Sequence, residues 1–190
     1  MNFYLLWEKS DKKALFKNTR EDSDIRKCNK CEGVRSILKK PLKFQLRDKK
    51  TSDFYDVMGH DVIGSGIQDI LLKHSFKGFS LSPVEIEVVN EKRLLDKELY
   101  KLARIEATGK GGFLHDLSGN KIPCCEKCGR IKILRNHKGI SVDEKEWDGS
   151  DIFYFNNWRG NLIITEDVYK VLNESNTQNV RFINLKEFVF

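Results

Sequence analysis

Four cysteines in two closely spaced pairs are the side chains of this sequence best suited to chemistry. Cys28 and Cys31 form one Cys-x-x-Cys knuckle, and Cys125 and Cys128 form a second. A Cys-x-x-Cys turn presents two thiolates to one metal ion, and a structural Zn²⁺ takes four such ligands at the corners of a tetrahedron. The two knuckles therefore predict one structural zinc ion, with no coordination position left for substrate water.

The separation of the knuckles leaves alternatives open. Between Cys31 and Cys125 lie 93 residues, far more than in a compact zinc ribbon. Redox-active pairs, two disulfides in an oxidising compartment and two separate metal sites are the competing interpretations. Cys124 adds a further choice, because it could replace Cys125 in a Cys-x-x-x-Cys turn or lie near the site as a buried thiol.

An internal repeat accounts for the separation. Residues 53–89 and 151–189 share an aromatic stretch, a glycine, an apolar pair, a short amphipathic helix and an alternating strand, related by a shift of 101 positions. The shift places the apolar helix positions Ile67, Ile70 and Leu71 on Val168, Val171 and Leu172. A knuckle precedes each unit, so packing the two units about a pseudo-dyad would bring the knuckles together, and the zinc would join the halves.

The expected elements follow from local signals. Apolar residues at i, i+3 and i+4 predict the two helices, the first beginning with a capping box of Ser65 and Gln68 and the second with Thr165 as N-cap. Lys77-Gly78 and Gln178-Asn179 are expected to end them. We also expect a strand over residues 98–107, followed by a turn at the glycine cluster 109–112.

These elements define the expected fold class. We predict an α+β protein with two pseudo-repeated strand-helix-strand units on mainly antiparallel sheet, joined by a zinc-ribbon-like clamp of four cysteines. Residues 1–190 would form a single domain, with pseudo-repeats at approximately 28–108 and 125–190. In this arrangement the metal stabilises a scaffold.

Composition limits the partners. The chain has 190 residues, 39% of them hydrophobic, and a formal net charge of +6, which is typical of a soluble globular protein. Its first residues have no basic leader or membrane-length apolar run, so we expect a cytoplasmic protein without membrane contact. The basic stretches at 39–40 and 47–50 lack interleaved aromatic residues, which makes nucleic acid the second choice of partner.

The residues offer little for catalysis. His60, His74, His115 and His137 are isolated in the sequence, and His74 falls on the apolar face of the first expected helix. Asn136-His137 resembles the start of an HNH nuclease motif, but no histidine follows it to complete that motif. Since no nucleophile elbow or H-E-x-x-H motif occurs either, we predict that the protein is not an enzyme.

The two knuckles, together with the segments 147–153, 160–166 and 180–182, resemble the double-CXXCG motif family of bacterial immunity proteins. The first knuckle departs from the motif, because Glu32 stands between Cys31 and Gly33. The resemblance implies a non-enzymatic protein that binds and neutralises one cognate toxin of a polymorphic toxin system. It supplies no toxin-binding residues. A zinc-ribbon-like nucleic-acid-binding protein is the alternative.

Overall fold

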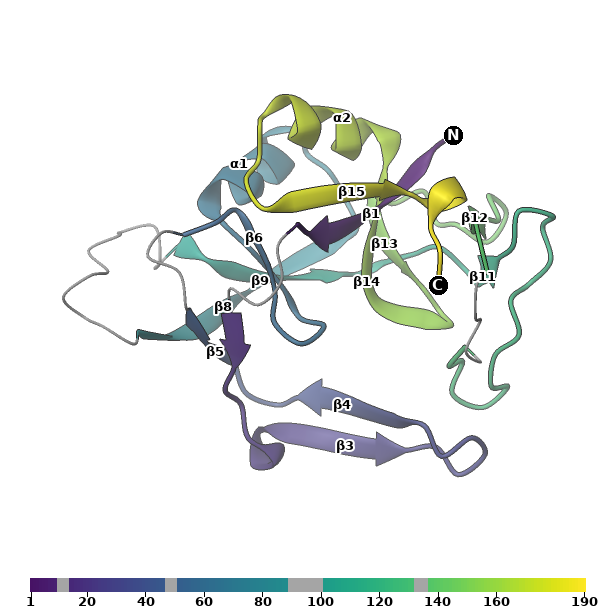
Figure 1. Ribbon diagram of the computed structural model, residues 1–190, viewed down its shortest axis with the longest axis horizontal. Coiled ribbons are helices and arrows are strands. Elements are labelled where there is room, and N and C mark those ends of the chain that lie inside the picture. Colours follow the sequence, from purple (N-terminus) through teal and green to yellow (C-terminus); the bar gives the residue numbers. More distant parts are fainter. Residues whose placement is uncertain (10–13, 47–50, 89–100, 132–136) are drawn as a thin grey trace.

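The computed structural model describes residues 1–9, 14–46, 51–88, 101–131 and 137–190, and confirms a mixed α+β fold built mainly from strands (Figure 1). The two described α-helices are α1 (Ser65–Lys73) and α2 (Glu166–Glu174). Two short 3-10 helices span Arg20–Asp22 and Leu185–Glu187. In the described ranges, no helix combines the length and apolar character that crossing a bilayer requires.

Two larger sheets and two two-stranded sheets contain the described strands. The five-stranded sheet has the order β10 (Gly109–Lys110), β13 (Ile152–Phe155), β14 (Trp158–Thr165), β1 (Phe3–Glu8) and β15 (Val180–Asn184). The six-stranded sheet has the order β2 (Ala14–Phe16), β5 (Leu42–Leu46), β8 (Phe79–Val88), β9 (Ala103–Ala107), β7 (Asp61–Ile63) and β6 (Phe54–Asp56). The two-stranded sheets are the hairpin of β3 (Ser23–Lys27) with β4 (Val34–Leu38), and the pair of β11 (Leu114–His115) with β12 (Ser141–Val142).

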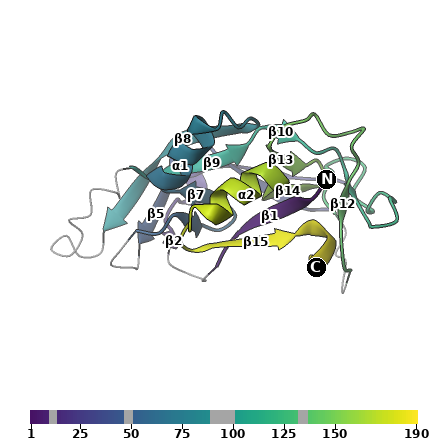
Figure 2. The ribbon, with the colours of Figure 1, turned by 90° about the horizontal axis from the view of Figure 1, so that it is seen from above.

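Antiparallel pairing predominates, as expected. Among the described strands, only β5 with β8 and β10 with β13 run parallel. Helices α1 and α2 contact each other and lie on the same side of the molecule (Figures 1 and 2). Their buried faces share one apolar core, to which the two halves contribute matching residues: Ile63, Ile67 and Leu71 from the first, and Ile164, Val168 and Leu172 from the second.

The repeated hairpin-helix-strand unit is present, but the sheets match the expected repeats only in part. Strand β9 lies between β7 and β8, and β1 lies between β14 and β15, antiparallel to both neighbours in each case. Ile105 pairs with Leu81 as Leu6 pairs with Phe182. Strand β9 is therefore the counterpart of β1. Counted from these two strands, the first half runs from β1 to β8 and the second from β9 to β15, and each of the two strands completes the sheet of the other half.

Hydrogen bonds between the halves follow the same pseudo-dyad. The Lys9 N–H donates to the Asn179 carbonyl over 3.1 Å, and the Thr108 N–H donates to the Gly78 carbonyl over 2.8 Å. Equivalent carboxylates also cross the boundary. Asp53 Oδ2 accepts the Gln178 N–H at 2.6 Å, and Asp151 Oδ2 accepts the Lys77 N–H at 2.8 Å.

The helix ends differ from the expected positions. Gly64 is the N-cap of α1, and the Gln68 side chain donates to the carbonyls of Ile63 and Lys101, so the expected capping box is wrong. Thr165 is the N-cap of α2, as expected. Both helices end earlier than the sequence suggested, because the chain first turns left-handed at Ser75 and Asn176, with φ of +55° and +51°.

The glycine cluster is also more than a turn. The expected strand is present over Ala103–Ala107, and Gly109 then begins β10, which pairs in parallel with β13. A Cβ atom at Gly109 would lie 2.4 Å from the Ile152 carbonyl oxygen, and one at Gly111 would lie 2.4 Å from the Phe153 ring. These glycines allow the two strands to approach closely.

The crossing carboxylates give a test of the intertwined halves. We expect Asp53→Ala and Asp151→Ala each to lower the free energy of unfolding by about 1 kcal/mol, because each leaves one backbone N–H without its charged acceptor. Urea unfolding monitored by circular dichroism measures the change. Glu144→Ala, at an exposed turn position, is the control and should change stability by less than about 0.5 kcal/mol. Equal losses in all three variants would contradict the pairing.

Candidate metal centre

The two knuckles have the same backbone structure. The first lies in the turn between β3 and β4, and the second lies between β11 and β12. The Cys28 N–H donates to the Gly33 carbonyl over 2.9 Å, and the Cys125 N–H donates to the Arg130 carbonyl over 2.8 Å. In each turn the residue after the second cysteine donates back to the first cysteine's carbonyl. The two turns therefore hold their cysteine sulfurs in equivalent positions.

The departure at Glu32 has a structural explanation. Glu32 occupies the position equivalent to Gly129, and both are left-handed, with φ of +56° and +74°. Gly33 serves another purpose, since a Cβ atom there would lie 2.9 Å from Cδ of Arg130, on the opposite knuckle. The first knuckle thus keeps the turn at the energetic cost of a left-handed glutamate, and uses its glycine for close packing against the second knuckle.

The four sulfurs form one group, and their spacing fits a tetrahedral metal. The Sγ atoms of Cys28 and Cys125 are 3.9 Å apart, those of Cys31 and Cys128 are 3.5 Å apart, and all four lie within 4.8 Å of one another. Four sulfurs at about 2.3 Å from a tetrahedral zinc ion would be separated by about 3.8 Å. Disulfide bonding requires about 2.0 Å, so these cysteines are free thiols that could hold a metal ion.

Backbone donors within the turns favour thiolates. N–H groups of Cys31 and Lys30 lower the pKa of Cys28 to about 6, and those of Cys128 and Lys127 lower the pKa of Cys125. At Cys31 the Gly33 N–H acts in the same direction, but contacts with the other three thiols, together with burial, raise its pKa to about 11. Without a cation, repulsion between neighbouring thiolates opposes the ionisation of all four thiols, whereas a divalent cation favours the fully deprotonated set.

The surroundings of the group hold the knuckles together. Cys125 is buried and Cys28 is half-buried, while Cys31 and Cys128 are exposed. An ion pair of Lys30 with Glu126 joins the tips of the two turns. Such contacts orient the ligand-bearing loops around the metal position.

Cys124 lies outside this group. The four clustered sulfurs belong to the two Cys-x-x-Cys turns, and Cys124, half-buried, instead forms an isolated β-bridge with Ile131. Two separate metal sites do not fit this arrangement, because the sulfurs of both knuckles meet at one point. The spacing of the cysteines predicted the ligands, but it did not predict that Cys28 lies next to Cys125 across the two halves.

The histidines lie on separate elements. His60 stacks on Phe16 at 5.9 Å between ring centroids, and burial together with the nearby Arg104 charge lowers its pKa to about 4. His74 is an exposed C-cap of α1, so its expected place on the apolar face is wrong. His137 packs near the Phe190 ring, 6.2 Å away.

A group that sequence spacing did not reveal surrounds His115. Its side chain comes close to the carboxylates of Asp143 and Glu146. Both carboxylates accept hydrogen bonds from the backbone: Glu146 Oε2 accepts the Phe113 N–H at 2.7 Å, and Asp143 Oδ1 accepts the Lys145 N–H at 3.0 Å. The Glu146 bond holds the turn against the residue before β11, and the Asp143 bond lies within the turn, which gives both carboxylates a structural role.

A cleft opens beside the four-sulfur group. Its volume is about 1280 Å³, and residues of the β3–β4 hairpin, the second knuckle, β9 and β14 line it. Cys28 and Cys128 are among its lining residues. The candidate metal centre and the cleft therefore share one wall.

Comparison with known proteins adds no family to this description. No protein-family model matches the chain, and no curated protein matches it. The candidate metal centre consequently rests on the knuckle spacing and the sulfur geometry. Membership of the double-CXXCG family stays a prediction.

Removal of single ligands tests the centre. We expect purified wild-type protein to contain about one zinc ion per chain by mass spectrometry of the metal, and Cys28→Ser and Cys125→Ser each to lose most of it with a large loss of stability. Cys124→Ser is the matched control and should retain its zinc. Full metal content in both knuckle variants would contradict the shared site.

The left-handed glutamate gives an independent test of the turn. We expect Glu32→Gly to raise the free energy of unfolding by about 1 kcal/mol, because glycine adopts positive φ without steric cost. The exposed ion pair with Lys27, at 3.4 Å, is a small loss by comparison. Asn29→Gly, within the same turn but without positive φ, should not stabilise the protein. Urea unfolding of the metal-loaded proteins compares them.

Proposed function

We propose that this chain is a non-enzymatic immunity protein that binds and neutralises a cognate bacterial toxin in the cytoplasm. One structural zinc ion, held by Cys28, Cys31, Cys125 and Cys128, would stabilise its scaffold. The toxin would be recognised elsewhere on the surface, because four thiolates leave a zinc ion no position for another ligand.

The observation that carries the proposal is the meeting of both knuckles in one four-sulfur group. The two motifs are part of the resemblance to double-CXXCG immunity proteins, together with segments 147–153, 160–166 and 180–182, and a common site gives both motifs one purpose. Equivalent backbone hydrogen bonds in the two turns support this view, including at Glu32, where the sequence departs from the motif.

The site chemistry also supports a binding role over catalysis. A closed tetrathiolate centre cannot activate water. Each of His60, His74 and His137 contacts an aromatic ring. Free thiols at disulfide-incompatible distances fit a reducing compartment, which supports a cytoplasmic location.

A nucleic-acid-binding protein is the second candidate. The cleft favours it, since seven of its lining residues are cationic and only two are acidic. Phosphate binding releases counterions, so this candidate predicts affinity for random DNA or RNA that falls steeply with salt. An immunity protein has no such requirement.

Growth protection tests the proposed function. The gene next to the one for this chain is expected to encode a secreted toxin with a variable carboxy-terminal domain. Expression of that domain should arrest growth, and coexpression of this chain should restore it. A toxin domain from an unrelated system is the control, which the chain should leave active. Unrelieved arrest despite folded, zinc-loaded protein would refute the proposal.

A further inference from the structure

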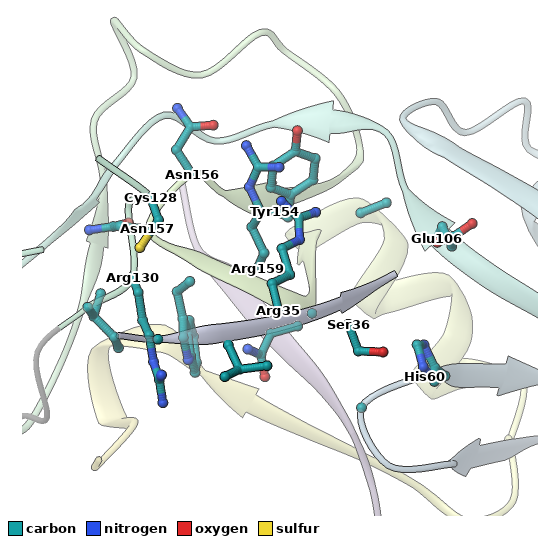
Figure 3. A pocket seen from close by; sticks show the side chains of 18 of the residues that line it. Arg35, Ser36, His60, Glu106, Cys128, Arg130, Tyr154, Asn156, Asn157 and Arg159 are labelled. Atoms are coloured by element: carbon teal, nitrogen blue, oxygen red, sulfur yellow. The ribbon is translucent and has the colours of Figure 1, made fainter. Parts of the chain in front are cut away.

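The cleft has two walls, and both are formed by regular secondary structure. Figure 3 shows Arg35 of β4 and Arg159 of β14 close to Tyr154, with Arg130 near Cys128 and with His60 and Glu106 further along. One wall is the β3–β4 hairpin, and the opposite side is formed by β9, β14 and the end of β13. The cleft therefore lies between the hairpin and both sheets.

The hairpin is held at both ends. At its open end, the Lys39 N–H donates to the Asp22 carbonyl over 2.8 Å, and Asn18 bridges the carbonyl of Pro41 and the N–H of Lys43. At its turn, Cys28 and Cys31 belong to the four-sulfur group. This anchoring gives the cleft a defined width before any partner arrives, which lowers the entropic cost of binding.

The charge of the cleft is positive and largely uncompensated. Of its seven cations, Arg26, Lys27 and Arg104 have carboxylate partners. Within the described ranges, the other four have no carboxylate partner in the structure: Arg35, Lys127, Arg130 and Arg159. All four side chains are exposed.

The hairpin carries a like-charge pair directly across its strands. Arg26 and Arg35 are register partners, so their side chains leave the same face of the ribbon. Like charges opposite each other destabilise a strand pair. Asp24 relieves Arg26 at 2.8 Å, whereas Arg35 has no such neighbour among the described residues. An anionic partner in the cleft would relieve the remaining repulsion.

The negative groups on the cleft floor weaken this field little. Glu106 is 2.6 Å from Arg104 and already paired. Burial and the neighbouring Asp56 carboxylate raise the pKa of Asp61 well above its ordinary value, because both disfavour its charged form. A carboxylate-bearing ligand therefore meets exposed guanidinium groups with little competing negative charge.

The aromatic side chains favour an acidic polypeptide over nucleic acid. Nonspecific binding of a single strand relies on free aromatic faces on which bases stack. Here the Arg159 guanidinium covers the Tyr154 ring at 5.1 Å, and the Trp158 ring packs against those of Phe188 and Phe190 at 5.2 and 5.3 Å. Arginine forks, in contrast, match carboxylates in bidentate geometry.

We propose that the cleft between the β3–β4 hairpin and strands β9 and β14 binds a carboxylate-rich surface segment of the partner protein. Arg35 and Arg159 form the centre of this site, and Arg130 and Lys127 extend it toward the knuckles. The proposal rests on the proposed function, in that it assigns the toxin-binding surface and the chemical class of what it recognises.

Binding of a defined acidic peptide tests the site without the toxin. The probe is a fluorescein-labelled polyglutamate of about ten residues, titrated with full-length zinc-loaded protein and followed by fluorescence anisotropy. We expect the double variant Arg35→Glu/Arg159→Glu to bind at least about tenfold more weakly, because two attractive contacts become repulsive. The milder double variant Arg35→Gln/Arg159→Gln should lose less.

Arg181→Glu is the matched control, because Arg181 is an exposed arginine on β15 that does not line the cleft. It changes one charge, so the single variants Arg35→Glu and Arg159→Glu are compared with it. Each should weaken binding more than Arg181→Glu, which should change affinity by less than about twofold. Circular dichroism and zinc content establish that every variant is folded. Equal losses at all three positions would overturn the proposal, because binding would then reflect net charge alone.

Two further measurements separate the alternatives. Tighter binding of a ten-nucleotide oligothymidylate than of polyglutamate, lost in the double variant, would overturn the proposal in favour of nucleic acid. In the growth assay, loss of protection by Arg35→Glu/Arg159→Glu but not by Arg181→Glu is expected. Full protection by the double variant would refute the cleft as the toxin site while leaving the immunity role intact. Failure of the wild type to protect refutes that role, whereas the peptide measurements still report on the cleft.

Discussion

The exchange of strands β1 and β9 between the two halves is the constraint on which the rest of the structure depends. Strand β1, from the first half, lies between β14 and β15 of the second half, and β9, from the second half, lies between β7 and β8 of the first half. Neither half can bury its helix without the strand from the other, because Leu6 and Ile105 belong to the shared core beneath α1 and α2. The pseudo-dyad that results brings together cysteines 97 positions apart, Cys28 with Cys125 and Cys31 with Cys128.

The same constraint explains the shape beside the metal centre. The first knuckle is the turn of the β3–β4 hairpin. The second lies in the connection between β11 and β12, where the Ile131 N–H donates to the Asn157 carbonyl of the β13–β14 turn, so the two equivalent turns extend from different elements. Joining them draws the hairpin across the body and encloses a cleft. Metal binding energy in such a site appears as folding energy. Here that energy would also fix the hairpin wall, so loss of the metal would loosen the cleft as well as the knuckles.

Local sequence signals predicted the elements better than their partners. The helices, the Thr165 N-cap and the knuckle cysteines follow from short-range spacing, and the α+β class follows from them. The role of β1 could not be found this way, because its match to β9 depends on register between distant strands and not on similar residues: Leu5 occupies the position of Arg104. Gly109 likewise suggested a turn, although its purpose is close contact with Ile152 across a strand pair that sequence spacing does not reveal.

Glu32 and Arg35 show how a scaffold and a working surface can occupy neighbouring positions. At Glu32 the left-handed backbone is retained at an energetic cost, because the knuckle must keep its hydrogen-bond pattern. Three residues later, Arg35 faces Arg26 across the hairpin, and no need of the fold explains this repulsive pair. The energetic cost at Glu32 is explained by the turn that carries the metal ligands, so it belongs to the scaffold. The repulsion between Arg26 and Arg35 has no such explanation in the fold. It lies on an exposed wall of a cationic cleft, where an anionic partner would relieve it. The binding surface is therefore assigned to the hairpin and not to the four sulfurs.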